Sequence, residues 1–103
     1  MTFEVERVIA AHHPALEGHF PGNPVVPGAL ILDEVLQAAR QWRGDIRLKE
    51  IRSVKFSSPL KPGDAFSIEL REANRSELVF ECRSCEVLLA SGTLSVEPNA
   101  GGA

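Results

Sequence analysis

Apolar and polar positions alternate in five stretches of the chain, and each stretch predicts a β-strand. The clearest is the third, where Phe66, Ile68 and Leu70 fall on one face and polar residues on the other. In the first strand, three apolar residues are expected to share a face: Phe3, Val5 and Val8. The five predicted strands cover residues 2–9, 48–56, 65–72, 78–84 and 88–96.

A helical period replaces the alternation over residues 29–43. Pro27 suits the first helical position and Gly44 a carboxyl-terminal stop. Leu30 is an apolar exception within the polar arc. One arc is apolar and contains Ile31, Leu32, Val35, Leu36, Ala38, Ala39 and Trp42. The opposite arc is polar and contains Asp33, Glu34, Gln37, Arg40 and Gln41.

The connections between these elements are rich in proline, glycine and asparagine. Four prolines and two glycines between residues 11 and 27 predict a long loop, and residues 57–64 form a turn cluster. One helix followed by antiparallel strands predicts an α+β fold with the helix packed on one face of the sheet. We expect a single domain over residues 1–97 and a flexible tail over 98–103.

Composition and charge narrow the function classes. The chain has 103 residues and a formal net charge of −3, so it lacks the basic excess that nucleic-acid binding requires. No apolar run approaches the length that spans a bilayer, and the first residues do not resemble a secretion signal. Two cysteines are too few for a disulfide framework. These features predict a soluble, cytoplasmic protein that binds neither nucleic acid nor membrane.

The three histidines all fall in the long loop and are the first candidates for chemistry. His12 and His13 are typical of solvated loop residues, whereas His19 lies between Gly18 and Phe20 in a segment with restricted backbone conformations. The histidines and Asp33 form a nominal zinc set, but their spacing matches no known zinc motif.

Two further features each allow a functional and a structural interpretation. Cys82 and Cys85 have redox-pair spacing, yet they fall at a strand end, which favours packing or an inert thiol. Gly28 begins a helix whose free N–H groups can bind an oxygen. Asp33 and Gln37, one turn apart, form either a solvated face or the acidic wall of a pocket, and the spacing does not decide between them.

One run resembles a known family over its whole length. Residues 18–33 read GHFPGNPVVPGALILD, which is similar to the FabZ/FabA-type 3-hydroxyacyl-acyl-carrier-protein dehydratases. The preceding HPAL at 13–16 resembles the short ApeI-like branch most closely. Residues 54–56 and 59–64, VKF and PLKPGD, resemble the family's later strand and turn.

The resemblance implies a hotdog fold, in which an antiparallel sheet wraps around one long central helix. It places the catalytic histidine on His19 and the acid on Asp33, with the Gly28 N–H bound to the thioester carbonyl. Gln37 matches a glutamine that positions the acid. The expected acyl-binding residues are Phe20, Val25, Val26 and Leu30.

These residue types suit the elimination of water from a 3-hydroxyacyl thioester. A histidine near neutrality takes the C2 proton, and an acid in an apolar setting gives a proton to the departing hydroxyl. The resemblance implies a homodimer with shared sites, an acyl carrier protein as partner, and neither a cofactor nor a metal. A basic patch is a candidate carrier-docking surface and contains Arg40, Arg43, Arg47, Lys49 and Arg52.

Two other functions remain open from the sequence: a hotdog thioesterase and a non-catalytic acyl-binding or partner subunit. The chain is short for the family and contains no tyrosine, which leaves the acyl length and the substrate open. The pathway, the carrier protein, any isomerase activity and the choice between a homodimer and a heteromeric or higher assembly are not predicted either. The ApeI-like features favour aryl-polyene or polyketide-type synthesis over housekeeping fatty-acid synthesis.

Overall fold

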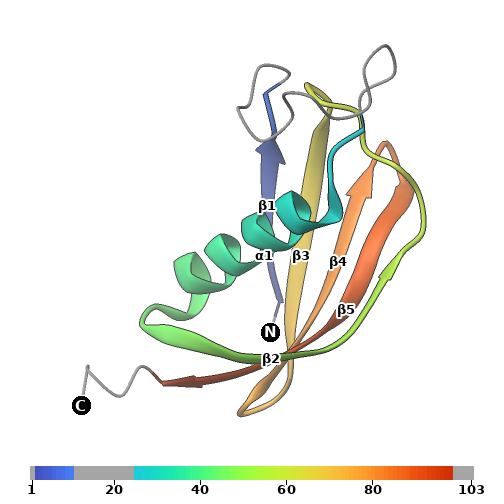
Figure 1. The fold of residues 1–103 in the computed structure, drawn as a ribbon. Coiled ribbons are helices and arrows are strands. Elements are labelled where there is room, and N and C mark those ends of the chain that lie inside the picture. The colour runs from blue at the N-terminus through green and yellow to red at the C-terminus, as the bar shows by residue number, and fades with distance from the viewer. Residues whose placement is uncertain (1, 11–24, 99–103) are drawn as a thin grey trace.

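The structure is a computed structural model, and it describes residues 2–10 and 25–98. One helix lies against a five-stranded antiparallel sheet with the strand order β1-β3-β4-β5-β2 (Figure 1). The elements in chain order are β1 (Thr2–Val8), α1 (Gly28–Arg43), β2 (Ile46–Phe56), β3 (Ala65–Asn74), β4 (Glu77–Ser84) and β5 (Val87–Pro98). The predicted α+β class is confirmed.

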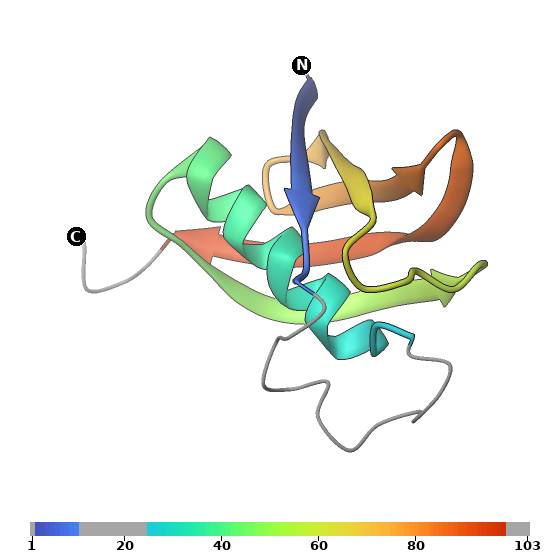
Figure 2. The same cartoon turned by 90° about the horizontal axis from the view of Figure 1, so that it is seen from above.

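The sheet curves around α1 and leaves the opposite side of the helix open in the described chain (Figures 1 and 2). Strands β3, β4 and β5 form two consecutive hairpins at its centre. Strand β2 pairs with β5 at one end of the sheet, and β1 pairs with β3 at the other. This is the wrapped arrangement that the hotdog resemblance implies.

The predicted apolar arc of the helix packs against the hydrophobic core, with Leu32, Leu36 and Trp42 only partly buried. Ile31, Val35, Ala38 and Ala39 are all buried against the sheet. Helix α1 ends at Gly44, whose φ of 82° favours glycine and whose N–H donates to the Arg40 carbonyl at 2.8 Å. The partners of the helix in the core are alternate residues of the central strands: Phe66, Ile68, Leu70, Leu78, Phe80, Cys82, Leu94 and Val96.

Several boundaries and one facing residue differ from the sequence prediction. Val8 is 55% exposed, because strict alternation from Phe3 and Val5 puts Arg7 on the inner face instead. Strand β2 begins at Ile46, two residues earlier than predicted. Pro98, assigned to the tail by its sequence, ends β5, and residues 99–103 lie outside the described part.

Within residues 2–10 and 25–98, the one helix is neither long enough nor apolar enough to cross a membrane.

Candidate functional site

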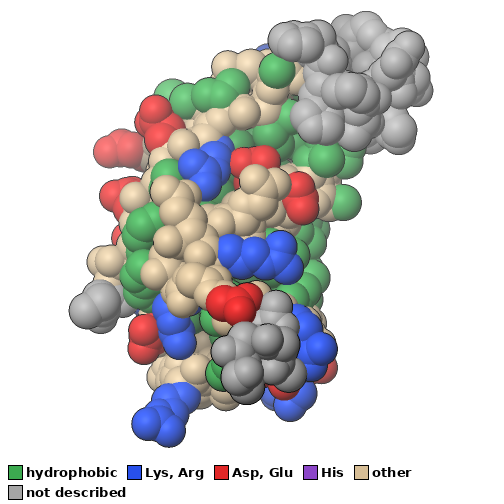
Figure 3. All heavy atoms as spheres, turned by 90° about the vertical axis from the view of Figure 1, so that its left-hand side faces the viewer, with side chains coloured by type: hydrophobic (Ala, Val, Ile, Leu, Met, Phe, Trp, Pro, Cys, Tyr) green, Lys and Arg blue, Asp and Glu red, His purple; other side chains and the backbone are tan. Residues whose placement is uncertain are grey.

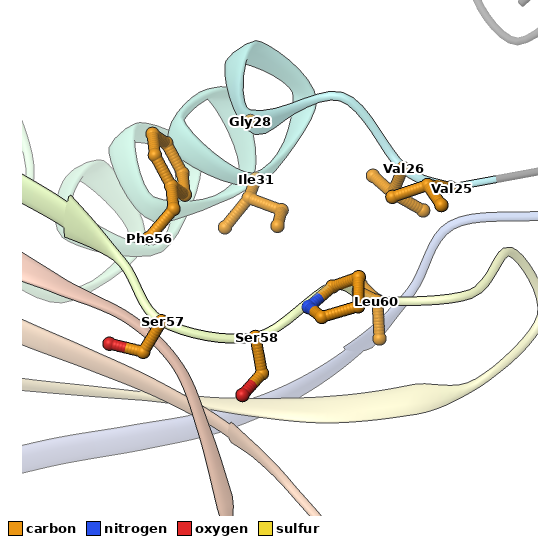
Figure 4. A pocket seen from close by; sticks show the side chains of 9 residues that line it. Val25, Val26, Gly28, Ile31, Phe56, Ser57, Ser58 and Leu60 are labelled. Carbon is orange, nitrogen blue, oxygen red and sulfur yellow. The ribbon is translucent and has the colours of Figure 1, made fainter. Parts of the chain in front are cut away.

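A cavity of about 320 Å³ lies between the amino end of α1 and the segment that follows β2 (Figure 4). Its lining comes from two parts of the chain that are far apart in sequence, residues 25–31 and 56–60. Most of the lining is apolar, and two serines follow β2. The lining residues are Val25, Val26, Gly28, Ile31, Phe56, Ser57, Ser58, Pro59 and Leu60.

Backbone hydrogen bonds fix the two walls of this cavity relative to each other. The Val26 N–H donates to the Leu60 carbonyl at 2.8 Å, which joins the chain before the helix to the segment after β2. The N–H groups of Ser57 and Ser58 donate to the Leu89 carbonyl at 2.8 and 3.3 Å. These bonds tie the 57–60 wall to β5 as well.

The amino end of α1 enters this cavity without a side-chain cap. Pro27 is the N-cap residue rather than the first helical residue, and its side chain has no group that can accept a hydrogen bond. The first turn, which begins at Gly28, contains no acidic residue. The first N–H groups of a helix have no partner within it and carry partial positive charge. This end of the cavity therefore suits an oxygen that carries or gains negative charge.

An aromatic ring approaches the backbone of Gly28 closely. A Cβ built on Gly28 would lie 2.5 Å from Cζ of Phe56 and 2.8 Å from Cε1 of the same ring. Phe56 thus packs directly against the helix start from the end of β2 (Figure 4). Because Gly28 has no side chain, the Phe56 ring can occupy the space beside it.

Asp33 and Gln37 lie on a different side of the helix from Gly28. Both side chains are exposed in the described chain, and the Gln37 Nε2 donates to Asp33 Oδ2 at 2.9 Å. Five residues separate Gly28 from Asp33, which corresponds to a rotation of about 140° around the helix. The carboxylate is therefore held by Gln37 on the side of the helix that faces away from its own sheet.

The structure brings together only some of the predicted site residues. Val25, Val26 and Gly28 line one cavity. Leu30 does not line it and instead packs, partly buried, against the hydrophobic core. The predicted catalytic residue His19 and the predicted acyl-binding residue Phe20 lie outside the described residues.

Sequence reasoning missed half of the cavity wall. Phe56, Pro59 and Leu60 occur in the VKF and PLKPGD segments, which were compared with the family but not assigned to the site. The available signal was the apolar residue at 56 directly before a turn cluster. Position alone could not reveal that this turn folds back onto the helix start.

The two cysteines occupy different environments. Cys82 is buried in β4, and burial raises the pKa of its thiol to about 12. Cys85 is exposed in the β4–β5 turn with a φ of 50°. Among the described residues, no group of three or more His, Cys, Asp and Glu side chains is arranged to hold a metal ion.

Carboxylates are interspersed with the basic residues that were predicted to form a docking patch. Arg43 pairs with Glu72 at 3.3 Å, and Arg47 pairs with Glu97. Arg52 contacts two carboxylates: Glu50 at 3.2 Å and Glu77 at 3.0 Å. Basic and acidic side chains lie side by side on the face shown in Figure 3. Because three of the five basic residues are paired, this surface lacks the uniform positive charge expected of the patch.

Comparisons with known proteins agree with the fold. The family model described as "ApeI-like: ApeI dehydratase" matches residues 1–93. The curated relative from Levilactobacillus brevis, a 3-hydroxyacyl-[acyl-carrier-protein] dehydratase FabZ, is 42% identical over 60 residues, covering 50% of this chain and 40% of the relative. The chain spans about half or less of the lengths of the first curated relatives it matches.

Two solved structures show the same fold at low sequence identity. The dehydratase heterocomplex ApeI:P from Xenorhabdus doucetiae has a TM-score of 0.82 at 22% identity, covering 92% of this chain and 86% of that chain. The fluoroacetyl-CoA thioesterase FlK has a TM-score of 0.72 at 14% identity, covering 95% and 86%. Because dehydratases and thioesterases share this fold, structural similarity alone does not separate the two classes of enzyme. The family match does: the chain belongs to the ApeI-like dehydratase family and has a hotdog fold.

Proposed function

We propose that this protein is a dehydratase that eliminates water from 3-hydroxyacyl thioesters carried by an acyl carrier protein, giving trans-2-enoyl thioesters. The observation that carries the proposal is the uncapped start of α1 at Gly28, which opens into an apolar cavity. A thioester places an apolar chain beside a polar carbonyl oxygen, and this cavity offers complementary groups for both.

The first half of the reaction is the loss of a proton from C2. His19 takes this proton, and the electrons of the C–H bond move toward the thioester carbonyl as negative charge develops on its oxygen. The Gly28 N–H and the positive end of α1 stabilise that charge. A preorganised donor of this kind contributes about 3–4 kcal/mol to transition-state stabilisation in other enzymes. The assignment of His19 rests on the sequence pattern.

The second half is departure of the hydroxyl from C3. The C3–O bond breaks, the C2=C3 double bond forms, and Asp33 gives a proton to the leaving oxygen directly or through water, so that water is released. The hydrogen bond from Gln37 supports this role because it fixes one carboxylate oxygen of Asp33. Acyl-chain contacts are assigned to Val25 and Val26 in the cavity.

We infer that the complete site requires a second copy of the chain. Asp33 faces away from the Gly28 cavity of its own chain, so one chain does not place both groups on one substrate. A second copy brings its own helix to the open side of α1. Strand β2 offers an edge for this pairing because it ends the sheet and exposes Ile51 and Val54.

The test measures enoyl absorbance with 3-hydroxyacyl thioesters of several lengths on a carrier protein. His19→Ala and Asp33→Asn are each expected to lower kcat/KM by about 10²–10⁴-fold, the usual contribution of a general acid or base. Glu34→Gln is the matched control. It removes the neighbouring carboxylate, which pairs with Arg7 at 3.3 Å and faces a different direction.

The outcomes separate the functions that the sequence left open. Release of free thiol without enoyl product supports the thioesterase. Carrier binding without any turnover supports a partner subunit. Equal loss of activity in Glu34→Gln and Asp33→Asn would contradict the assigned acid. Cytoplasmic location and a single domain over residues 1–97 stay predictions.

A further inference from the structure

We propose that the Phe56 side chain is the movable wall of the cavity and sets the size of the acyl group that reaches Gly28. The inference rests on the proposed function, and it adds a determinant of substrate selection to it. It begins from the contact between the Phe56 ring and the start of α1.

The ring occupies the space next to the proposed oxygen-binding group. Three of its atoms lie within 3.0 Å of the position that a Gly28 Cβ would take. Ring and helix start are therefore in direct van der Waals contact. Any acyl group that brings its carbonyl to the Gly28 N–H must pass beside this ring or displace it.

The other walls of the cavity are held more firmly than Phe56. The 57–60 wall is bonded through its backbone to Val26 and Leu89, and Ile31 and Leu60 are each 2% exposed within the core. Phe56, in contrast, is 49% exposed, so roughly half of its side chain has no packing partner in the described chain. An exposed side chain changes rotamer on the picosecond-to-nanosecond timescale, whereas a packed core side chain is confined by its neighbours. Phe56 is thus the lining side chain with both the size and the freedom to open or narrow the cavity.

Because a large, movable side chain lies at the mouth of a small cavity, the volume of that side chain determines which acyl groups can enter. With the ring against Gly28, a straight acyl chain fits beside it, whereas a branched or aryl-bearing chain must push it outward. Removing the ring leaves room for the bulkier groups and removes a packing surface for the straight ones. Even one methylene group in an apolar pocket changes specificity about 10–200-fold.

The test compares Phe56→Ala and Phe56→Leu with the unsubstituted full chain. The substrates are straight-chain and phenyl-bearing 3-hydroxyacyl thioesters of pantetheine. We expect Phe56→Ala to raise the kcat/KM ratio of phenyl-bearing to straight-chain substrate by tenfold or more, with Phe56→Leu intermediate. The change is expected mainly in KM, because the ring takes no part in the chemical step. A ratio that stays within twofold in both variants would overturn the proposal.

Val54→Ala is the matched control, since Val54 lies on the same strand two residues earlier and does not line the cavity. If Phe56→Ala acts only by disturbing the β2 edge, Val54→Ala shifts the ratio equally, and the proposal fails. Sedimentation of each variant shows whether assembly is retained.

Binding of unreactive pantetheine amides with the same acyl groups, measured by calorimetry, separates this proposal from the proposed function. If the unsubstituted protein converts no thioester, the dehydratase assignment fails, but a tenfold shift in amide selectivity in Phe56→Ala still supports the wall. If no form of the protein converts a thioester or binds an amide, both fail.

Discussion

The two end strands of the sheet, β1 and β2, differ in length, in regularity and in the side chains that they expose. Strand β1 has seven residues and alternates regularly, with Glu4 and Glu6 on its exposed face. Strand β2 has eleven residues, two register irregularities, and large apolar side chains at Ile51 and Val54 that remain exposed. Acidic residues protect an edge from further pairing, whereas exposed apolar residues on a long edge favour it.

The two strands also differ in what holds them. Strand β1 is bound to the helix through side chains. Phe3 stacks on Trp42 with ring centroids 5.9 Å apart, and Arg7 contacts Glu34 and Gln41. Strand β2 is held chiefly by its long pairing with β5. The comparison teaches that β1 closes the domain, while β2 continues into the cavity wall and offers a surface to a partner.

The largest expected effect comes from placing a charge on the β2 edge. Val54→Lys is expected to weaken self-association at least about 100-fold, because each copy would bury an unpaired ammonium and tenfold corresponds to about 1.4 kcal/mol. The measurement is sedimentation equilibrium over a range of concentrations. Val8→Lys on β1 is the control, since Val8 is also apolar and more exposed. Equal weakening in both variants would remove the distinction between the edges.

The next largest effect on stability is expected at Gly92, where β5 approaches the backbone of β2 closely. A Cβ on Gly92 would lie 2.2 Å from the backbone oxygen of Ser53, which cannot move without shifting β2. We expect Gly92→Ala to lower the free energy of unfolding by about 2–3 kcal/mol, in the range for overpacked sites. Urea titration measures this change.

Gly28→Ala is the matched comparison for Gly92→Ala. There the crowding atoms belong to the far end of the Phe56 side chain, which can rotate away. We expect a stability loss of less than about 1 kcal/mol, and Phe56→Ala should abolish it. A loss at Gly28 as large as that at Gly92 would show that the Phe56 ring is fixed rather than movable.

A smaller effect is expected at the side-chain attachment of β1. Arg7→Met removes a partly shielded ion pair with Glu34 at 3.3 Å and an exposed hydrogen bond to Gln41 at 2.7 Å. We expect a loss of about 1 kcal/mol, the usual contribution of such bonds. Hydrogen exchange should quicken at amides of β1 and leave β2 unchanged. Faster exchange in both strands would mean that Arg7 stabilises the whole domain.

The elements of the fold were predictable because each carries its own local pattern. The apolar arc of α1 packs against the core as predicted, although Leu32, Leu36 and Trp42 are only partly buried, and Gly44 ends the helix as predicted. The prediction for Val8 is wrong because residues on one face of a strand are two positions apart, and Val8 is three positions after Val5. The β2 edge escaped prediction, since its apolar residues look like core residues in sequence and only the strand order leaves them exposed.

The site was less predictable than the fold because it joins distant segments. Val25, Val26 and Gly28 were identified within one continuous motif. Phe56 and Leu60 belong to the same cavity only because the chain after β2 returns to the helix start, where Leu60 accepts the Val26 hydrogen bond. No local period encodes that return. Leu30 is close to Gly28 in sequence but packs against the core instead of lining this cavity, so its predicted contact with the acyl chain stays a prediction.

The smallest expected effect concerns the pairing of β2 with β5 at low pH. The hydrogen bond from Arg47 to Glu97 lowers the pKa of the Glu97 carboxyl below its ordinary value of 4.5, with the charge of Arg47 acting in the same direction. A carboxyl whose pKa is lower in the folded state stabilises that state above the unfolded pKa and loses this contribution as pH falls through the folded one. Glu97→Gln should therefore leave stability slightly reduced at pH 7 and unchanged at pH 2, with the difference disappearing below about pH 4.5. Because both side chains are exposed, added salt should also diminish the difference. Thermal unfolding of both proteins across this pH range measures it, and a difference that persists at pH 2 would show that Glu97 acts through packing on β2 rather than through its charge.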